Sequence, residues 1–284
     1  MKTAIDSFCF HRYFGEVYPE LESFPDRTWS IDMFVDFARD LGVQGISIEH
    51  FMVPDLSAKS LDTLRLSVEE ANLELVWAWG HPNGLSSGQD PEALHDLERH
   101  IDVAAALGSS VMRICAGGRR TRIEDWAEHR RLLVPLLGAA AERAAARNVT
   151  LALENHADLY GEEILDLLQA VDNPYLGICL DTGNNLRMLE DVMPVIEALA
   201  PHAKAVHLKD IAAYRGDPRH FGFWPSVPLG EGLIDVPRAL RALQGVGYDG
   251  LLAVEIDFLK PGNGDETAAV TQSIDSLKLF LDQL

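Results

Sequence analysis

Cysteine and long apolar runs are scarce in this sequence. Its 284 residues include only three cysteines, Cys9, Cys115 and Cys179, and none belongs to a Cys-x-x-Cys pair. This excludes a disulfide framework or a cysteine-rich zinc module, and we expect buried, reduced thiols in a cytoplasmic protein. No apolar stretch is long enough to span a bilayer, and the first residues lack the apolar core and cleavage site of a signal peptide.

Positive charge is also in short supply, and this limits the classes of partner. The chain has 24 Lys and Arg residues against 44 Asp and Glu, which gives a net charge of -20 at pH 7. Such a negative field repels phosphate backbones and anionic lipid surfaces, so we expect neither a nucleic-acid nor a membrane partner. A small neutral substrate remains compatible with this charge.

The sequence does contain enough apolar residues, 47%, for one large core, and we expect a single domain over residues 1–284. Strand-like runs occur near residues 4–10, 45–50, 73–79, 110–115, 149–155, 175–180, 203–208 and 250–256. Helical segments follow near residues 31–41, 58–71, 91–107, 122–147, 160–171, 188–200, 235–245 and 265–283. Ser30 and the pair Asp90-Pro91 are typical of helix starts, and Gly42 of a helix end. Eight alternating units predict an α/β fold, a (β/α)8 TIM barrel.

Side-chain alternation in the late strands favours a barrel over an open sheet. Leu151 and Leu153 alternate with Ala152 and Glu154, and the other late strands show the same pattern. One face is apolar and should meet the helices, whereas the other is small and becomes polar at the strand end. That second face suits the lumen and the carboxyl-terminal mouth of a barrel. An open doubly wound sheet, the alternative, has strands that are apolar on both faces.

Four polar residues stand one apiece at the ends of late strands: Glu154 in LALENH, Asp181 in GICLDTGN, His207 in KAVHLKD and Glu255 in LLAVEID. The gaps between them are 27, 26 and 48 residues, about one strand–helix unit each, with a long loop in the last. In a barrel they converge at one mouth. Three buried carboxylates without a cation would be very costly, so we expect a divalent metal. The mostly oxygen donor set favours Mn²⁺, with Co²⁺, Mg²⁺ or Zn²⁺ as alternatives.

A metal held in this way suits a substrate with adjacent carbonyl and hydroxyl oxygens. Chelation polarises the carbonyl and acidifies the neighbouring C–H, and a carboxylate can then take the proton. Glu154 and Glu255 lie on the predicted fifth and eighth strands, so that one could deprotonate one face of a metal-stabilised enediolate while the other reprotonates the opposite face. This predicts an isomerase or epimerase acting on a sugar, keto sugar or polyol.

Five motifs, in the order LALENH, LDTGN, VHLKD, PLGEGLID and GYDGLLAVEID, resemble the xylose-isomerase-like barrel superfamily of sugar phosphate isomerases and epimerases. The resemblance covers most of the chain and is sharpest in its second half. It implies a metal held by Glu154, Asp181, His207 and Glu255. It also implies that Glu154 and Glu255 are the acid/base pair, as in epimerase-like members.

Two positions depart from that pattern. Asn184 stands three residues after Asp181, where ketose epimerases of the superfamily often carry a histidine. His156, two residues after Glu154, resembles dehydratase members in which this histidine is the general base. The alternative function is therefore a lyase or dehydratase acting on a cyclic keto acid or 3-keto sugar, with His156 as the base. Otherwise His156 orients Glu154.

Two other classes fit less well. An abasic-site endonuclease shares the barrel, but it needs several zinc ions and more histidine ligands than the ten histidines here supply at strand ends. A binding or partner subunit without catalysis is opposed by the intact set of four ligands.

Several residues are candidates for substrate contacts. Lys209 either meets a substrate oxygen or forms a salt bridge with Glu255 or Asp257, and Glu49 and Arg113 either bind substrate or pair with each other. The remaining candidates are Trp79, His81, Asn184, Arg215 and Trp224.

Two loops stand out near the predicted mouth. The loop at about 210–234 is long enough for an active-site lid, and 116–122 (AGGRRTR) is a candidate anion site. We expect a carbohydrate substrate and a homo-oligomer, a dimer or tetramer, with which an accessory subunit is compatible.

Overall fold

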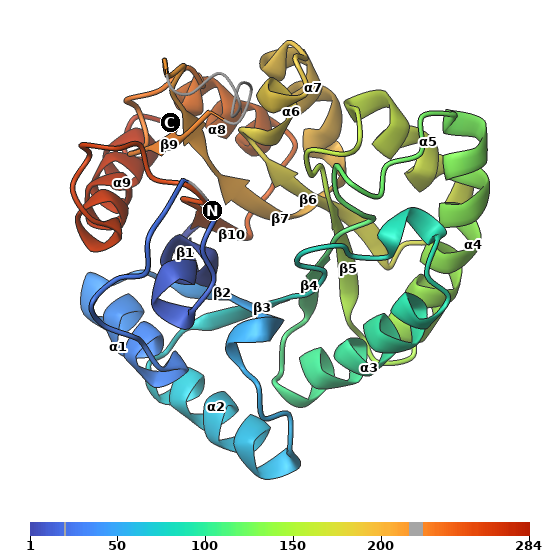
Figure 1. Cartoon of the computed structure of the whole chain (residues 1–284), viewed down its shortest axis with the longest axis horizontal. Coiled ribbons are helices and arrows are strands. Elements are labelled where there is room, and N and C mark those ends of the chain that lie inside the picture. Colours follow the sequence, from blue (N-terminus) through green and yellow to red (C-terminus); the bar gives the residue numbers. More distant parts are fainter. Residues whose placement is uncertain (20, 216–223) are drawn as a thin grey trace.

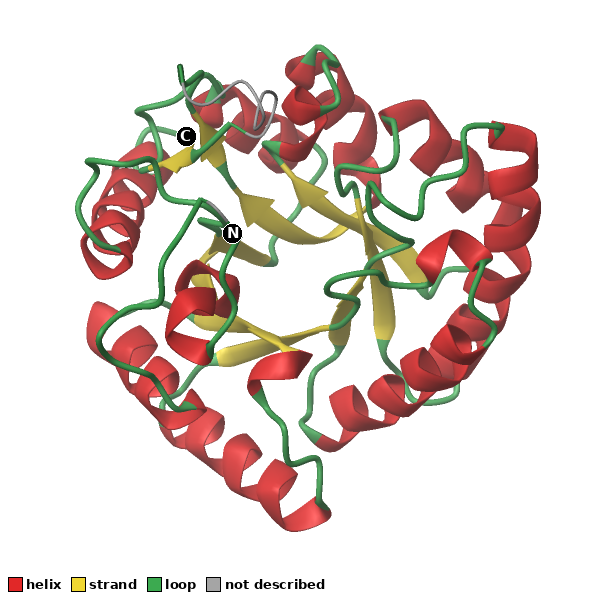
Figure 2. Ribbon diagram, viewed as in Figure 1, coloured by secondary structure: helices red, strands yellow, loops and turns green. Residues whose placement is uncertain are grey.

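The chain forms a closed ring of parallel strands surrounded by helices (Figures 1 and 2). The structure, a computed structural model, describes residues 1–19, 21–215 and 224–284. The barrel strands are β1 (Lys2–Asp6), β2 (Gly45–Glu49), β3 (Glu74–Ala78), β4 (Val111–Ile114), β5 (Thr150–Glu154), β6 (Leu176–Asp181), β7 (Ala203–Leu208) and β10 (Leu251–Val254). Their order in the ring is β1-β10-β7-β6-β5-β4-β3-β2, so the first and last strands close it. This confirms the predicted (β/α)8 TIM barrel.

Helices form the outer layer of the molecule (Figure 2). In the described part of the chain the α-helices are α1 (Ile31–Leu41), α2 (Ala58–Glu70), α3 (Glu92–Ala106), α4 (Trp126–Ala145), α5 (Gly161–Val171), α6 (Asn184–Arg187), α7 (Val192–Leu199), α8 (Val236–Gly245) and α9 (Glu266–Leu281). Short 3-10 helices are η1 (Ser7–Phe14), η2 (His50–Met52), η3 (Ser86–Gly88) and η4 (Ala200–His202).

The predicted helix signals lie at helix ends, although α3 begins one residue later than the pair Asp90-Pro91 predicts, with Pro91 as its N-cap. The Ser30 hydroxyl accepts a hydrogen bond from the Met33 amide at the start of α1, and Gly42 ends that helix with a left-handed φ of 69°. The Asp90 carboxylate accepts a hydrogen bond from the Glu92 amide at 3.0 Å, beside Pro91. Local capping therefore fixes where these helices begin and end.

The two faces of the strands pack differently. Leu151 and Leu153 of β5 are fully buried in the main apolar core, between the barrel and the helices. The inward residues Ala152, Cys179 and Ala205 form a separate small cluster in the lumen. The side chains in the lower lumen are therefore small, and the polar side chains lie at the carboxyl ends of the strands.

Three predicted segments differ from the structure. The first strand ends at Asp6 rather than near residue 10, because the Asp6 side chain caps the 3-10 helix η1. Of the predicted helix 188–200, only Val192–Leu199 forms an α-helix, α7; the short α6 precedes the predicted range and η4 begins at its last residue. The long loop at 210–234 contains a small antiparallel sheet of β8 (Asp210–Ile211) and β9 (Ser226–Val227), while 216–223 lie outside the described residues.

Candidate metal centre

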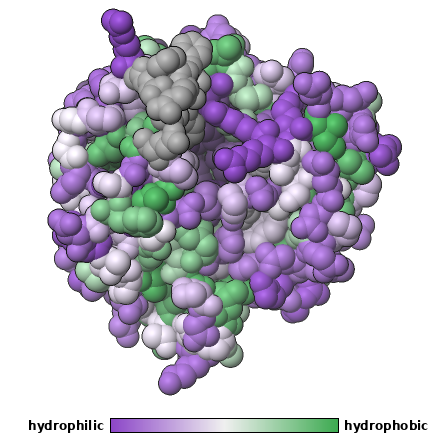
Figure 3. Space-filling view, viewed as in Figure 1, coloured by the Kyte–Doolittle hydropathy of each residue, from purple (hydrophilic) through white to green (hydrophobic). Residues whose placement is uncertain are grey.

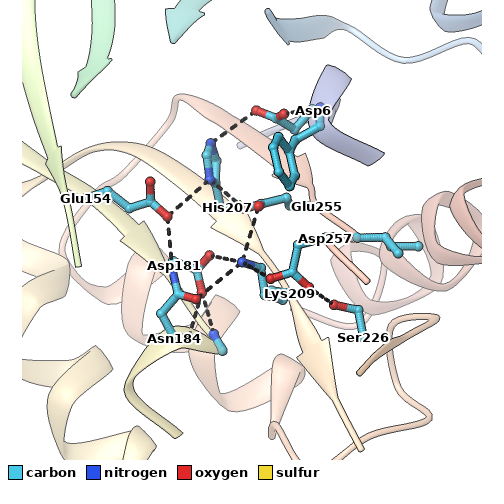
Figure 4. A network of polar contacts seen from close by, with 12 residues as sticks. Asp6, Glu154, Asp181, Asn184, His207, Lys209, Ser226, Glu255 and Asp257 are labelled. Atoms are coloured by element: carbon cyan, nitrogen blue, oxygen red, sulfur yellow. Dashed lines mark hydrogen bonds and ion pairs between the residues drawn. The ribbon is translucent and has the colours of Figure 1, made fainter. Parts of the chain in front are cut away.

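Four side chains converge at the carboxyl-terminal mouth of the barrel (Figure 4). Glu154 and Asp181 are the last residues of β5 and β6, His207 lies in β7, and Glu255 directly follows β10. All four are buried, and one ligand atom from each lies within 4.8 Å of the others. Because the strands are parallel, their carboxyl ends meet at one mouth, so residues far apart in the sequence are brought together.

The donor atoms of this cluster are close but incompletely paired. His207 Nδ1 lies 2.8 Å from Glu255 Oε2 and 3.9 Å from Glu154 Oε1. His207 Nδ1 and Glu255 Oε2 face each other and Asp181 Oδ2 faces the Lys209 amine, but none of these three buried atoms makes a hydrogen bond of good geometry among the described residues. Buried carboxylate oxygens and an imidazole nitrogen facing one point are suitable ligands for a divalent ion. These residues therefore fit a divalent metal.

Glu154 is held by groups on both sides. Arg113 Nε lies 3.0 Å from Oε2, and the Asn184 side-chain amide donates to Oε1 at 3.0 Å. A second nitrogen of Arg113 pairs with buried Glu49. Burial favours the neutral acid, but the positive charge of Arg113 holds the pKa of Glu154 below its ordinary value. Glu154 therefore remains ionised.

Lys209, the residue after β7, is buried among acids. Its Nζ lies 2.9 Å from Asp181 Oδ2 and 3.2 Å from both Glu255 Oε1 and Asp257 Oδ2. Burial opposes the charge on this amine, but the three carboxylates raise the pKa of Lys209 well above its usual range. Burial likewise opposes ionisation of Glu255, but Lys209 and His207 lower the pKa of that carboxyl. Of the two roles that the sequence left open for Lys209, the structure shows the salt bridge.

Asp181 is positioned by the backbone and by a neighbouring amide. Its Oδ1 accepts hydrogen bonds from the backbone amides of Gly183 and Asn184, at 2.7 and 2.8 Å. The Asn155 side chain bonds to both the amide and the carbonyl of Asp181, each at 2.7 Å, and so ties β5 to β6. Burial raises the pKa of Asp181 to about 6, although Lys209 opposes the rise.

A cavity of about 340 Å³ lies above this centre. Figure 3 shows hydrophilic side chains gathered around the middle of this face. The predicted site residues that line the cavity are His81, Arg113, Glu154, His156, Asn184, Lys209 and Glu255. A larger cavity of about 670 Å³ lies at the amino-terminal end of the barrel, lined by residues such as Val76, Val111 and Leu251. None of the four cluster residues faces it, so we place the candidate site at the carboxyl-terminal mouth.

His156 is positioned differently from the four ligands. Its side chain is 36% exposed, and Nδ1 lies 3.5 Å from the fully buried carboxylate of Asp158. Burial favours the neutral ring, but Asp158 and Glu154 raise the pKa of His156. The ring is therefore accessible from the cavity and has an acidic partner behind it.

Four predicted contacts lie away from the cavity. Trp79 is buried, and its indole nitrogen donates to Asp96 of α3 at 2.8 Å, on the helix side of the barrel. Glu49 is fully buried in its pair with Arg113. Arg215 is exposed, and Trp224 contributes a backbone carbonyl to Arg187 rather than its ring to the cavity. None of these four residues lines the cavity of about 340 Å³, so their substrate contacts remain predictions.

Several residues of the mouth escape prediction from the sequence. Phe8, Tyr18, Arg187 and Asp257 line the cavity but are not among the predicted site residues, and Arg119 and Arg120 line it as well. Arg119 and Arg120 belong to the candidate anion loop, whereas Arg122 of that loop pairs with Glu163 at 2.7 Å. For Asp257 a signal existed, because it follows Glu255 by two residues and thus shares its inward face.

The chain belongs to the family described as xylose isomerase-like TIM barrel, which it matches over residues 35–280. Its relatives include enzymes of three kinds. It is 38% identical over 89 residues to the 3-oxo-isoapionate decarboxylase of Pectobacterium atrosepticum, covering 31% of this chain and 32% of that protein. It is 26% identical over 172 residues to the 3-dehydroshikimate dehydratase of Pseudomonas putida, covering 57% and 26% respectively. It is 29% identical over 168 residues to an L-ribulose-5-phosphate 3-epimerase of Escherichia coli, covering 58% and 56%.

These sequence matches span between about a quarter and just over half of the relatives' length. Two solved structures share the fold over almost the whole chain. The structure of an L-ribulose 3-epimerase has a TM-score of 0.76 at 18% identity and covers 99% of this chain and 95% of its own. The IOLI protein with a binding zinc atom has a TM-score of 0.76 at 16% identity, covering 100% and 99%.

Among the described residues no helix has the length and apolar character that crossing a membrane requires.

Proposed function

We propose that this chain is a divalent-metal-dependent isomerase or epimerase acting on a sugar, keto sugar or polyol. The observation that carries the proposal is the buried cluster of three carboxylates and one imidazole at the base of a cavity of about 340 Å³. The zinc atom bound by the IOLI protein, a structural neighbour, supports a metal here, and the oxygen-rich donor set leads us to favour Mn²⁺.

Glu154, Asp181, His207 and Glu255 would hold the ion. Bound there, it would polarise a substrate carbonyl and acidify the adjacent C–H bond. Glu154 and Glu255 come from β5 and β10, which are separated in the ring by β6 and β7. One carboxylate removes the proton from one face of the substrate, and the other returns a proton to the opposite face. Asn184, which also lines the cavity, donates a hydrogen bond that orients Glu154.

A second candidate is a lyase acting on a cyclic keto acid or 3-keto sugar, with His156 as the general base. The supporting observation is that both glutamates have an oxygen beside a cation, Arg113 or Lys209, whereas the His156 ring is accessible. Hydrogen-bonded carboxylates of lowered pKa are weak bases, and an imidazole backed by a carboxylate is a stronger one. The dehydratase and decarboxylase relatives make this candidate worth testing beside the first.

Metal content and product mass test the proposal in turn. Elemental mass spectrometry of the purified chain is expected to find about one divalent ion per chain, which an Asp181→Ala/His207→Ala double variant loses. No metal in the wild type, even after incubation with excess Mn²⁺, Co²⁺, Zn²⁺ or Mg²⁺, would refute the proposed mechanism.

A screen of keto sugars and polyols then separates the two candidates. An isomerase or epimerase gives a product of unchanged mass. Loss of water or of carbon dioxide identifies a lyase.

A further inference from the structure

Asp6, at the end of β1, contacts one of the proposed metal ligands from behind. It is fully buried, and its Oδ2 lies 3.3 Å from Nε2 of His207 (Figure 4). The opposite ring nitrogen, Nδ1, faces Glu255 and Glu154. His207 therefore presents one nitrogen to the cluster and the other to a buried carboxylate.

This arrangement determines which nitrogen of His207 is free to bind a cation. A neutral imidazole carries one N–H, and a nitrogen that coordinates a metal must carry no proton. A carboxylate accepts hydrogen bonds and cannot donate one, so Asp6 favours the tautomer with the proton on Nε2. In that tautomer the lone pair of Nδ1 points toward the other three ligands.

Asp6 is itself held rigidly. Its Oδ1 accepts a hydrogen bond from the Phe8 amide at 2.6 Å and so caps η1. Its Oδ2 lies 3.3 Å from Nε2 of His207, and the Ser47 side chain also lies beside this carboxylate. The backbone turn after β1 thus fixes one carboxylate oxygen and aims the other at the ring.

We propose that Asp6 is a positioning residue that sets the tautomer and orientation of His207 and thereby the affinity of the metal centre. The inference rests on the metal site of the proposed function and is independent of the substrate. Loss of such an outer carboxylate weakens metal binding by about 10- to 100-fold in metalloproteins.

The substitution Asp6→Asn tests this assignment sharply. The asparagine Oδ1 still accepts from the Phe8 amide, so the cap on η1 is kept. Its Nδ2 then donates to His207 Nε2 and moves the ring proton to Nδ1, which faces the cluster. We expect Zn²⁺ affinity, measured by competition with a chromophoric chelator, to fall by about 10- to 100-fold.

Asp235→Asn is the matched control. Asp235 caps α8 through the Arg238 amide at 3.0 Å, and it lies outside the cavity and the cluster. This control should bind Zn²⁺ as the wild type does, and circular dichroism should show the same fold for both variants. Wild-type affinity in Asp6→Asn would overturn the inference and leave the proposed function standing. A wild type that binds no metal would overturn both.

A measurement on the unaltered protein covers the case in which Asp6→Asn fails to fold. Imidazole ¹⁵N spectra of the Zn²⁺-loaded wild type, assigned with a His207→Gln variant, should show the His207 proton on Nε2. A proton on Nδ1 would overturn the inference.

Discussion

Replacing Lys209 by methionine should strongly destabilise the folded protein. The side chain is buried, and its amine contacts three carboxylates at 2.9 to 3.2 Å, from Asp181, Glu255 and Asp257. Methionine retains much of the volume but removes the cation. The three acids then remain buried with fewer opposite charges, which is unfavourable because water no longer solvates them.

The size of the effect follows from this burial. Removing one partner of a buried ion pair costs about 3–5 kcal/mol, because the other partner is left uncompensated. For a chain of this length each kcal/mol lowers the melting temperature by about 2–4 °C, so the expected decrease is roughly 6–20 °C. Because Lys209 contacts three acids rather than one, we expect the decrease in melting temperature to lie in the upper half of its range.

Urea unfolding in the presence of a chelator measures this change without a contribution from bound metal. Lys204→Met is the matched control, because Lys204 lies on β7, carries the same side chain and is exposed. The free energy of unfolding of this control should stay within about 0.5 kcal/mol of the wild type. If Lys209→Met were equally mild, the carboxylates around it would not be ionised, and the electrostatic account of the centre would be wrong.

Three further predictions concern activity and pH. Glu154→Gln should lower kcat by about 100- to 10 000-fold in a steady-state assay, and a fully active variant would remove this residue from the mechanism. His156→Ala should abolish turnover in a lyase but only weaken it in an isomerase. His11 has both ring nitrogens 2.8 Å from acceptors, the Phe8 carbonyl and Glu22, which requires both to carry protons. Burial opposes this charge, but Glu22 raises the pKa of His11, so its stabilisation should be complete below about pH 6.5 and lost as pH rises through the folded value. Urea unfolding at several pH values should therefore show that the difference in free energy of unfolding between the wild type and His11→Gln becomes smaller as pH rises. A difference that does not change with pH would contradict this prediction.

The parts of the site that the sequence predicted are those with a local signal. Glu154, Asp181, His207 and Glu255 each follow a short apolar run, and parallel strands in a ring direct all such positions to one mouth. The pairing of Arg113 with Glu49 could only be offered as one of two alternatives. Glu49 and Arg113 lie on β2 and β4, with β3 between them, so their pairing depends on a distance across the mouth of the barrel that the sequence does not contain.

Two features of the site could not be predicted from the sequence, for physical reasons. The Trp79 indole lies on the helix side of the barrel, because Trp77 stacks on His100 of α3 and a residue two positions later shares its side of the strand. The position of Asp6 at a strand end could not be predicted, because the aromatic run after it has the composition of a strand and extends the predicted strand to about residue 10. Its partner, His207, lies near the other end of the sequence, and only closure of the ring brings the two together.

The barrel closes where its first and last strands pair, from Lys2 with Leu251 to Ile5 with Val254. The next residue on each strand, Asp6 and Glu255, flanks His207. During synthesis on the ribosome, a chain that has emerged only as far as β7 contains three of the four ligands. It lacks Glu255 and also β10, one of the two strands that pair with β1. The complete centre forms only after the last strand has docked. An ion bound there would therefore favour the finished ring over every shorter intermediate, since a ligand stabilises only the state that binds it.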